Sequence, residues 1–191
     1  MLAATAATGA AAVAGCLDES GAFGDDTDAN DEPSNEATGG SGALGDPAET
    51  VTVTVVMRPS PQFDPGIVHV EPGGTVHWDI EGLRHSVTAY HPETYGPQRI
   101  PDGVEPFDSG TLREGHEFEV TFEEEGIYDY VDTRRLCGSH EALGAVGRVV
   151  VGWPDLEGQP ALEHDPAELP SRGETVMREY NDETWAALND G

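Results

Sequence analysis

Hydrophobic and polar residues alternate with a period of two between residues 51 and 152. The alternation comes in short runs closed by turn residues, a pattern typical of β-strands, and no convincing helical pattern separates the runs. It predicts an all-β domain of roughly one hundred residues, an antiparallel Greek-key sandwich or barrel of about seven to eight strands. The runs are 51–57, two around the Pro-Gly-Gly turn within 67–80, then 85–90, 116–122, 126–131 and 147–152.

The first fifteen residues, "MLAATAATGAAAVAG", are uncharged and are followed directly by Cys16. They are too short and too alanine-rich for a membrane span, and they fit the apolar region of a lipoprotein-type signal peptide. Val13-Ala14-Gly15-Cys16 resembles a lipobox, which predicts a lipid anchor on Cys16. A disordered alanine-rich terminus is the alternative, and the lack of a basic residue before the apolar run suggests that the true start lies upstream.

Residues 16–50 form an acidic linker, with ten acidic residues and no basic ones after Cys16. It has too little apolar surface to offset its ordering entropy, so we expect a disordered tether. Residues 153–191 form a second acidic segment. Its apolar positions at four-residue spacing, from Val176 to Leu188, predict a short amphipathic helix, and the pattern leaves open whether the helix packs on the domain or stays mobile.

Net charge is −28, from 37 Asp and Glu against nine basic residues, all of them arginine. Such a surface repels nucleic acid and anionic lipid headgroups, so we expect no nucleic-acid partner. An acidic chain without lysine is typical of proteins from extreme halophiles, where concentrated salt screens the repulsion. The charge serves solubility or forms an acidic docking surface, and these two roles are compatible.

A cysteine and two histidines stand where loops of a sandwich would meet. Cys137 and His140 lie just before the last predicted strand, and His85 begins an earlier one. Loops gather at the ends of a sandwich, so these three side chains can converge. Thiolate sulfur and imidazole nitrogen suit copper or zinc, and a His₂Cys set with a weak axial methionine is the blue-copper arrangement.

The domain resembles the cupredoxins, in particular the plastocyanin-like halocyanins of salt-loving archaea. The resemblance covers roughly residues 50–152 and also fits the lipobox and the acidic linker. Five blocks in the family's order carry it: "EPGGTVHW", "HSVTAYHPE", "RIPDGVEPFDSGTL", "FEVTFEEEGIYDY" and "CGSHEALGAVGRVVVG".

The resemblance implies a mononuclear type 1-like copper site with His85, Cys137 and His140 as ligands. It implies a one-electron carrier, not an enzyme, held by its lipid anchor on the outer face of the cell membrane. The expected partners are membrane redox complexes or other electron-transfer proteins. They would dock on a monomer at the edge of His140 and the neighbouring Leu143 and Ala145.

The sequence departs from the family's pattern in two places. Ala145 stands where the family has its axial methionine, and it offers no donor atom. The stretch "DTRRL" (132–136) reads as an insertion before the cysteine, so that Asp132 occupies the place a shorter loop would give to that cysteine. Without methionine the site still has three in-plane ligands, and entry of water or of a carboxylate such as Glu141 would lower the potential.

Other functions remain open. A cupredoxin domain that has lost copper, with a binding or structural role, is one, and a copper carrier is another. A thiol enzyme is suggested only by a superficial likeness of "CGSH" to a papain-type motif. Of the remaining residues, His91 is a possible substitute ligand. We expect His69, His77 and His116 to face outward, and Trp78 and Tyr130 to be buried in the core.

Overall fold

The computed structural model describes residues 39–135 and 139–189. Cys16, the signal-like leader, Cys137 and most of the acidic linker lie outside the described residues, so the predictions made for them stay predictions. The strands are β1 (Ala48–Val56), β2 (Gln62–Asp64), β3 (Ile67–Ile80), β4 (Thr88–Ala89), β5 (Glu117–Phe122), β6 (Gly126–Val131) and β7 (Val146–Val151). Among them lie the helices η1 (Glu141–Leu143), α1 (Pro160–Glu163), η2 (Pro166–Glu168) and α2 (Ser171–Leu188).

The strands follow the order β2-β1-β3-β7-β6-β4, with β5 paired to β3. β3 joins the two layers of the sandwich: its first residues pair with β7, and its last residues pair with β1 and β5. The Pro-Gly-Gly stretch bends this strand, with Gly73 at φ +84°, a conformation that favours glycine. The two runs expected within 67–80 are therefore one bent strand.

The expectation of a purely antiparallel sandwich is wrong, because β1–β3 and β3–β7 pair in parallel. Period-two alternation shows which face of a strand is apolar, but it carries no information about the direction of the neighbouring strand. The prediction of an all-β sandwich is confirmed. Its core lies between the layers, where Trp78 and Tyr130 are both fully buried, as expected.

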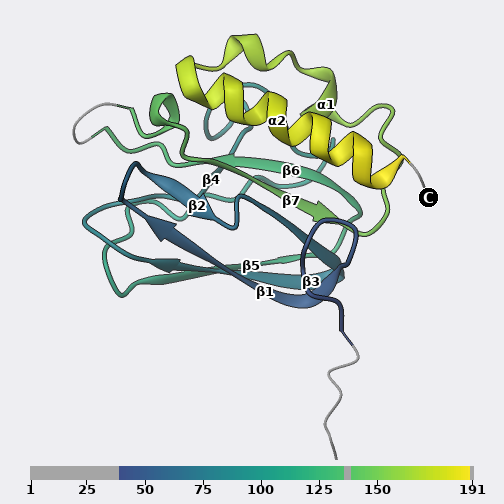
Figure 1. Cartoon of the computed structure of the whole chain (residues 1–191), viewed down its shortest axis with the longest axis horizontal. Helices are drawn as coiled ribbons and strands as arrows, with labels where there is room; N and C mark the ends of the chain where they lie inside the picture. Colours follow the sequence, from purple (N-terminus) through teal and green to yellow (C-terminus); the bar gives the residue numbers. More distant parts are fainter. Residues whose placement is uncertain (1–38, 136–138, 190–191) are drawn as a thin grey trace, which may run out of the picture. The chain divides into compact units, whose positions relative to one another are not determined.

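β6 and β7 are buried at every position. Figure 1 shows the reason: α1 and α2 cover the outer face of the layer that holds these strands. Met177 of α2 is fully buried in a second cluster with Val131 and Val146. The tail thus contains a helix of 18 residues, longer than the short one expected, and it packs on the sandwich.

A buried ionic cluster attaches the tail to the sheet. The carboxylate of Asp129 on β6 accepts hydrogen bonds from Arg99 (3.0 Å) and from two guanidinium nitrogens of Arg148 on β7 (2.7 and 3.0 Å). All three side chains are inaccessible to solvent. Arg99 also donates to the carbonyls of Ala161 and His164, and Arg148 donates to the carbonyl of Tyr180 in α2. The two arginines therefore satisfy backbone groups of the tail as well as Asp129.

His69 on β3 is fully buried, contrary to the expectation that it faces outward. Its Nδ1 accepts from the amide of Gly45 (3.0 Å), and its Nε2–H donates to the carbonyl of Gly152 (2.6 Å). The residues before β1 cover this position, and the strand pattern alone could not reveal that cover. Burial lowers the pKa of His69, although the nearby Asp46 carboxylate acts in the opposite direction.

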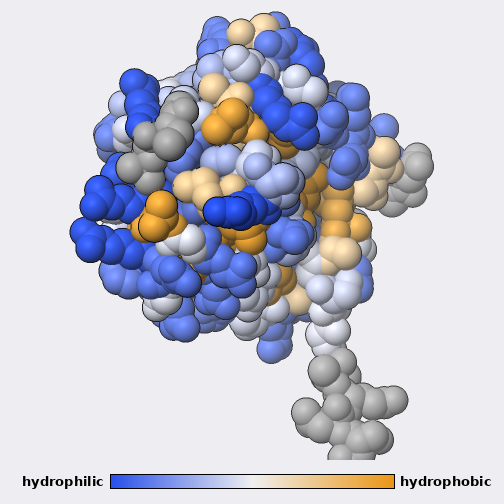
Figure 2. Space-filling view, turned by 60° about the vertical axis from the view of Figure 1, so that its left-hand side comes forward, coloured by the Kyte–Doolittle hydropathy of each residue, from blue (hydrophilic) through white to orange (hydrophobic). Residues whose placement is uncertain are grey.

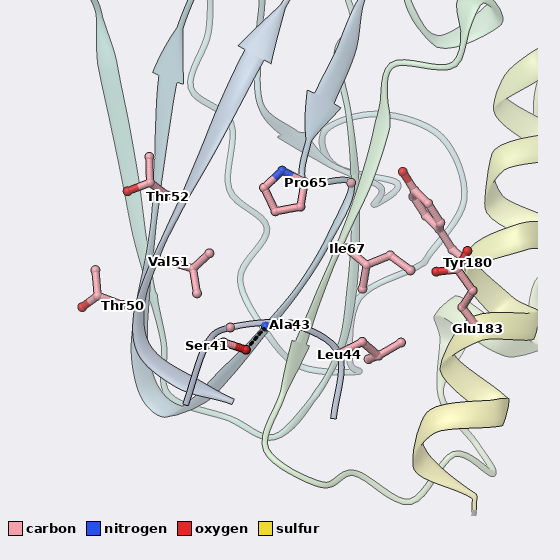
Figure 3. Close-up of a pocket in the computed structure, with 12 residues that line it drawn as sticks. Ser41, Ala43, Leu44, Thr50, Val51, Thr52, Pro65, Ile67, Tyr180 and Glu183 are labelled. Carbon is pink, nitrogen blue, oxygen red and sulfur yellow. Dashed lines mark hydrogen bonds between the residues drawn. The ribbon is translucent and has the colours of Figure 1, made fainter. Parts of the chain in front are cut away.

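A hollow among the described residues lies between the segment before β1, the strands β1 and β3, and α2. It has a volume of about 650 Å³, and Figure 3 shows it lined by small or apolar side chains, with Tyr180 and Glu183 on the helix side. None of its lining residues is a histidine or a cysteine. In the described part of the chain, no helix combines the length and hydropathy needed to cross a bilayer.

Candidate metal centre

The two predicted histidine ligands lie at the same end of the sandwich and are buried. His85 precedes β4 and is fixed by two backbone hydrogen bonds with Leu112, its amide donating over 3.1 Å and its carbonyl accepting over 2.9 Å. His140 stands immediately before η1, and its amide donates to the carbonyl of Arg134 (2.9 Å). The side chain of His85 is fully buried and that of His140 is 3% exposed.

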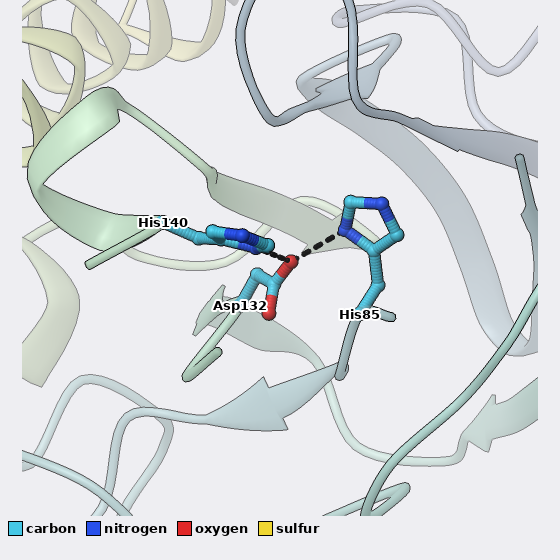
Figure 4. Close-up of side chains that lie close together, drawn as sticks. All are labelled: His85, Asp132 and His140. Carbon is cyan, nitrogen blue, oxygen red and sulfur yellow. Dashed lines mark hydrogen bonds and ion pairs between the residues drawn. The ribbon is translucent and has the colours of Figure 1, made fainter. Parts of the chain in front are cut away.

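Asp132 lies between these histidines (Figure 4). Its Oδ2 is 2.6 Å from Nδ1 of His85 and 2.7 Å from Nδ1 of His140. One donor atom from each of the three residues lies within 4.8 Å of the other two. The structure therefore brings together three buried side chains that can bind a metal, of which the sequence prediction named His85 and His140 as ligands.

The other carboxylate oxygen of Asp132 is also satisfied. Oδ1 accepts from the amides of Ser86 (3.1 Å) and Arg134 (3.0 Å). Burial alone would raise the pKa of Asp132, but the hydrogen bonds from His140, His85 and Arg134 outweigh burial, so its pKa lies below the usual value. With Asp132 ionised, each imidazole donates its Nδ1–H. The described residues offer no hydrogen-bond partner to the buried Nε2 of His85.

Ala145, at the position expected for an axial ligand, is fully buried beside the cluster. Its amide donates to the carbonyl of His140 (2.9 Å), and its carbonyl accepts from the amide of Asp132 (3.0 Å). The backbone of residue 145 is thus adjacent to both groups, while its methyl side chain offers no donor. A longer side chain at residue 145 would therefore start next to His140 and Asp132.

Glu141, which the sequence suggested as a carboxylate that could enter the site, is held elsewhere. Tyr90 donates to its Oε1 (2.8 Å) and Tyr95 to its Oε2 (2.6 Å). Burial, together with the Glu141 carboxylate, raises the pKa of both tyrosines, so both hydroxyls stay protonated and can donate. This trio supports η1 directly behind His140. This contact could not be predicted from the sequence, because the tyrosines lie about fifty residues before Glu141.

The remaining predicted residues are placed as follows. Cys137 and Cys16 lie outside the described residues, so their roles as copper ligand and lipid attachment site stay predictions. His91 stands apart from the cluster, and its Nδ1 accepts from the amide of Glu93 (3.1 Å). It is therefore not a substitute ligand in this arrangement.

Comparison with known proteins supports the resemblance stated above. No family model matches the chain. A halocyanin of Natronomonas pharaonis is 33% identical over 106 residues, which are 54% of this chain, and the chain spans a little over half (56%) of that relative's length. A pseudoazurin from Sinorhizobium superposes with a TM-score of 0.57 at 18% identity, over 72% of this chain and 98% of the pseudoazurin. One from Hyphomicrobium denitrificans gives 0.57 at 21% identity, over 70% and 97%.

The chain has the cupredoxin fold. In this domain the histidines and Asp132 lie at one end of the sandwich, and the tail helix packs against η1, which follows His140 directly. The carbonyl of Glu141 would lie 2.9 Å from a Cβ added at Gly173 in α2, so the helix approaches the site loop closely. The tail is therefore part of the structure that supports the candidate centre.

The surface of the domain near His140 differs from the one expected. His140 and Ala145 are buried, so the predicted docking edge is reduced to Leu143, which is 42% exposed. On the face in Figure 2, hydrophilic residues predominate and hydrophobic ones form small, separate patches. Leu83, in the loop before His85, is 72% exposed.

Proposed function

We propose that this cupredoxin is a mononuclear copper protein that carries single electrons. One observation carries the proposal: Nδ1 of His85 and Nδ1 of His140, from loops far apart in the sequence, are buried and directed at one point. Two imidazoles at one end of a β-sandwich form half of a copper site. The similarity to a protein named halocyanin supports the same assignment.

The donor atoms present fit copper, because imidazole nitrogen binds it well and all the groups are shielded from water. Copper bound there would supply a one-electron couple between Cu(I) and Cu(II). The chain's own contribution is rigidity. Backbone hydrogen bonds to Leu112 hold His85, and those to Arg134 and Ala145 hold His140, so both imidazoles keep one arrangement in either oxidation state. Cys137 is the proposed third ligand on the strength of the family resemblance.

The proposal includes export and attachment to the membrane through a lipid on Cys16. The linker that follows would leave the domain mobile at the outer face of the cell membrane. A monomer would then exchange electrons with membrane redox complexes or with other electron-transfer proteins. These statements rest on the lipobox-like "VAGC" and on the acidic composition of residues 16–50.

Visible spectroscopy tests the copper proposal. We expect the protein loaded with Cu(II) to show an intense thiolate-to-copper charge-transfer band, and we expect Cys137→Ser to abolish it. Copper at one hundred times its dissociation constant should stabilise the fold by about 2.7 kcal/mol, measured as a higher melting temperature. Ala145→Met should shift the band if residue 145 is axial. Absence of both the band and the stabilisation would overturn the proposal.

A copper-free binding or structural domain is the second candidate, and a specific observation favours it. Asp132 accepts a hydrogen bond from the Nδ1–H group of each histidine. The buried carboxylate and both imidazoles therefore have hydrogen-bond partners without a metal. On that reading, neither Cu(II) nor Zn(II) raises the melting temperature. A saturable rise with either ion would exclude it.

A further inference from the structure

Asp132 stands where Nδ1 of His85 and Nδ1 of His140 converge. Its Oδ2 is the only carboxylate oxygen among the described residues that lies within hydrogen-bond distance of both Nδ1 atoms. We propose that Asp132 is itself a metal ligand, completing a buried His₂Asp set with His85 and His140. The inference concerns the same site as the proposed function and names one of its ligands. It does not involve residues 136–138.

The geometry supports coordination through Oδ2. A metal with bonds of about 2.0–2.2 Å keeps neighbouring donor atoms roughly 3.3 Å apart. The present separations of 2.6 and 2.7 Å are hydrogen-bond distances, so Oδ2 needs to move away from each Nδ1 by only roughly 0.6–0.7 Å to admit the ion. The ion would bind Nδ1 of each neutral imidazole, so the proton that each Nδ1 now donates to Asp132 would be carried on Nε2 of the same ring instead.

The other carboxylate oxygen of Asp132, Oδ1, is held in place by hydrogen bonds from neighbouring groups. Oδ1 accepts from the amides of Ser86 and Arg134, and the Ser86 hydroxyl lies within 3.4 Å of it. Hydrogen bonds of this kind fix the orientation of a ligating carboxylate. Oδ2 in turn points between the imidazoles (Figure 4). The backbone therefore orients Asp132 so that one oxygen is reserved for the site.

The ligand set determines which cations fit. Two imidazoles and one carboxylate suit borderline divalent ions, with Cu(II) binding more strongly than Zn(II). A hard, anionic oxygen favours Cu(II) over Cu(I), which prefers soft sulfur. If the chain carries electrons as proposed, Asp132 therefore lowers the reduction potential, and its removal should raise it.

The experiment uses the full chain carrying Cys137→Ser, so that binding without the thiol can be measured. We expect this variant to bind one Cu(II) without an intense visible band, as followed by titration against a competing chelator. Adding Asp132→Asn should weaken binding at least 100-fold. Asp102→Asn, the same change at an exposed position, is the matched control and should leave the affinity unchanged.

The variant Asp132→Cys tests whether residue 132 binds the metal directly or only orients the two histidines. A charge-transfer band requires a direct bond between sulfur and copper, so Asp132→Cys in the Cys137→Ser background should create the band. Thr133→Cys in the same background is the control and should not. Folding of each variant without metal is checked by circular dichroism, and if either Asp132 variant does not fold, the other decides.

The outcomes distinguish this inference from the proposed function. Copper affinity unchanged by Asp132→Asn, or a folded Asp132→Cys variant without a band, overturns the ligand role of Asp132. A band in the unmodified chain that depends on Cys137 would still support the electron carrier in that case. Conversely, binding that depends on Asp132 in a chain that never shows the Cys137 band supports the inference while the type 1-like site fails.

Discussion

The buried cluster beneath the tail helices offers a sharp test of how the fold is held together. Asp129 accepts three hydrogen bonds of 2.7–3.0 Å from the guanidinium groups of Arg99 and Arg148. Asp129→Asn keeps the volume and shape of the side chain, so it creates no cavity. It removes the charge and places an amide where both arginines require acceptors. The effect measured is therefore electrostatic.

The expected cost follows from the burial of all three groups. Removing one partner of a buried ion pair typically destabilises a protein by about 3–5 kcal/mol, because a charge is left uncompensated. A domain of this size has a total stability of roughly 5–15 kcal/mol. With about 2–4 °C per kcal/mol, the melting temperature should fall by roughly 6–20 °C. The loss should persist in concentrated salt, since ions do not screen buried charges effectively.

Chemical denaturation at low and high salt measures this cost. Glu174→Gln is the matched control, because it removes a carboxylate from a partly exposed pair with Arg178 (3.1 Å) in α2. Solvent and dissolved ions screen this pair, so it should contribute little to the free energy of unfolding. If the free energy of unfolding of Asp129→Asn lies within about 1 kcal/mol of that of the unmodified chain, the ionic cluster does not stabilise the tail and the reasoning is refuted.

Two further changes test buried positions away from the candidate centre. Because burial holds the pKa of His69 below its usual value of about 6.5, its neutral form contributes stability that is fully present above that value and is lost as the pH falls toward the folded-state pKa. His69→Gln should flatten the pH dependence of unfolding between pH 7.5 and 5.5, and exposed His116→Gln should not; equal slopes would contradict this. Gly147→Ala should cost about 1–3 kcal/mol, because a Cβ at 147 would overlap the ring of Tyr130. Gly39→Ala, where nothing lies within 4 Å, is its control, and similar stabilities for the two variants would show that the strand shifts to make room.

Much of the β-domain could be predicted from the pattern of residues. Period-two alternation located most of the strands and the interior positions of Trp78 and Tyr130, because alternate side chains of a strand face opposite sides. The blocks shared with cupredoxins indicated the sandwich fold and singled out His85 and His140. The pattern could not show that 67–80 is one bent strand with parallel neighbours, since strand direction depends on distant connections.

Part of the candidate centre could also be predicted from the sequence, and part could not. Residue type and local spacing were enough to propose an imidazole pair, but they could not show that Glu141 is taken up by two tyrosines. The alignment with the family placed Asp132 where a shorter loop would have its cysteine. Only the folded loops show that Oδ2 of Asp132 lies between Nδ1 of His85 and Nδ1 of His140. Contacts of this kind join residues that lie eight to fifty positions apart.

The sequence by itself determined the class of fold, the strand positions and the histidine pair, because each is encoded in residues close together or in a shared order of motifs. Tertiary structure decided what covers the sheet. The pattern located β6 and β7, but it did not show that α1 and α2 bury the outer face of these strands. There Arg148 donates both to Asp129 and to the carbonyl of Tyr180 in α2. A polar residue in a strand either faces solvent or is buried against a hydrogen-bonding partner. Only the folded chain distinguishes these two cases, because the position of the partner depends on long-range packing.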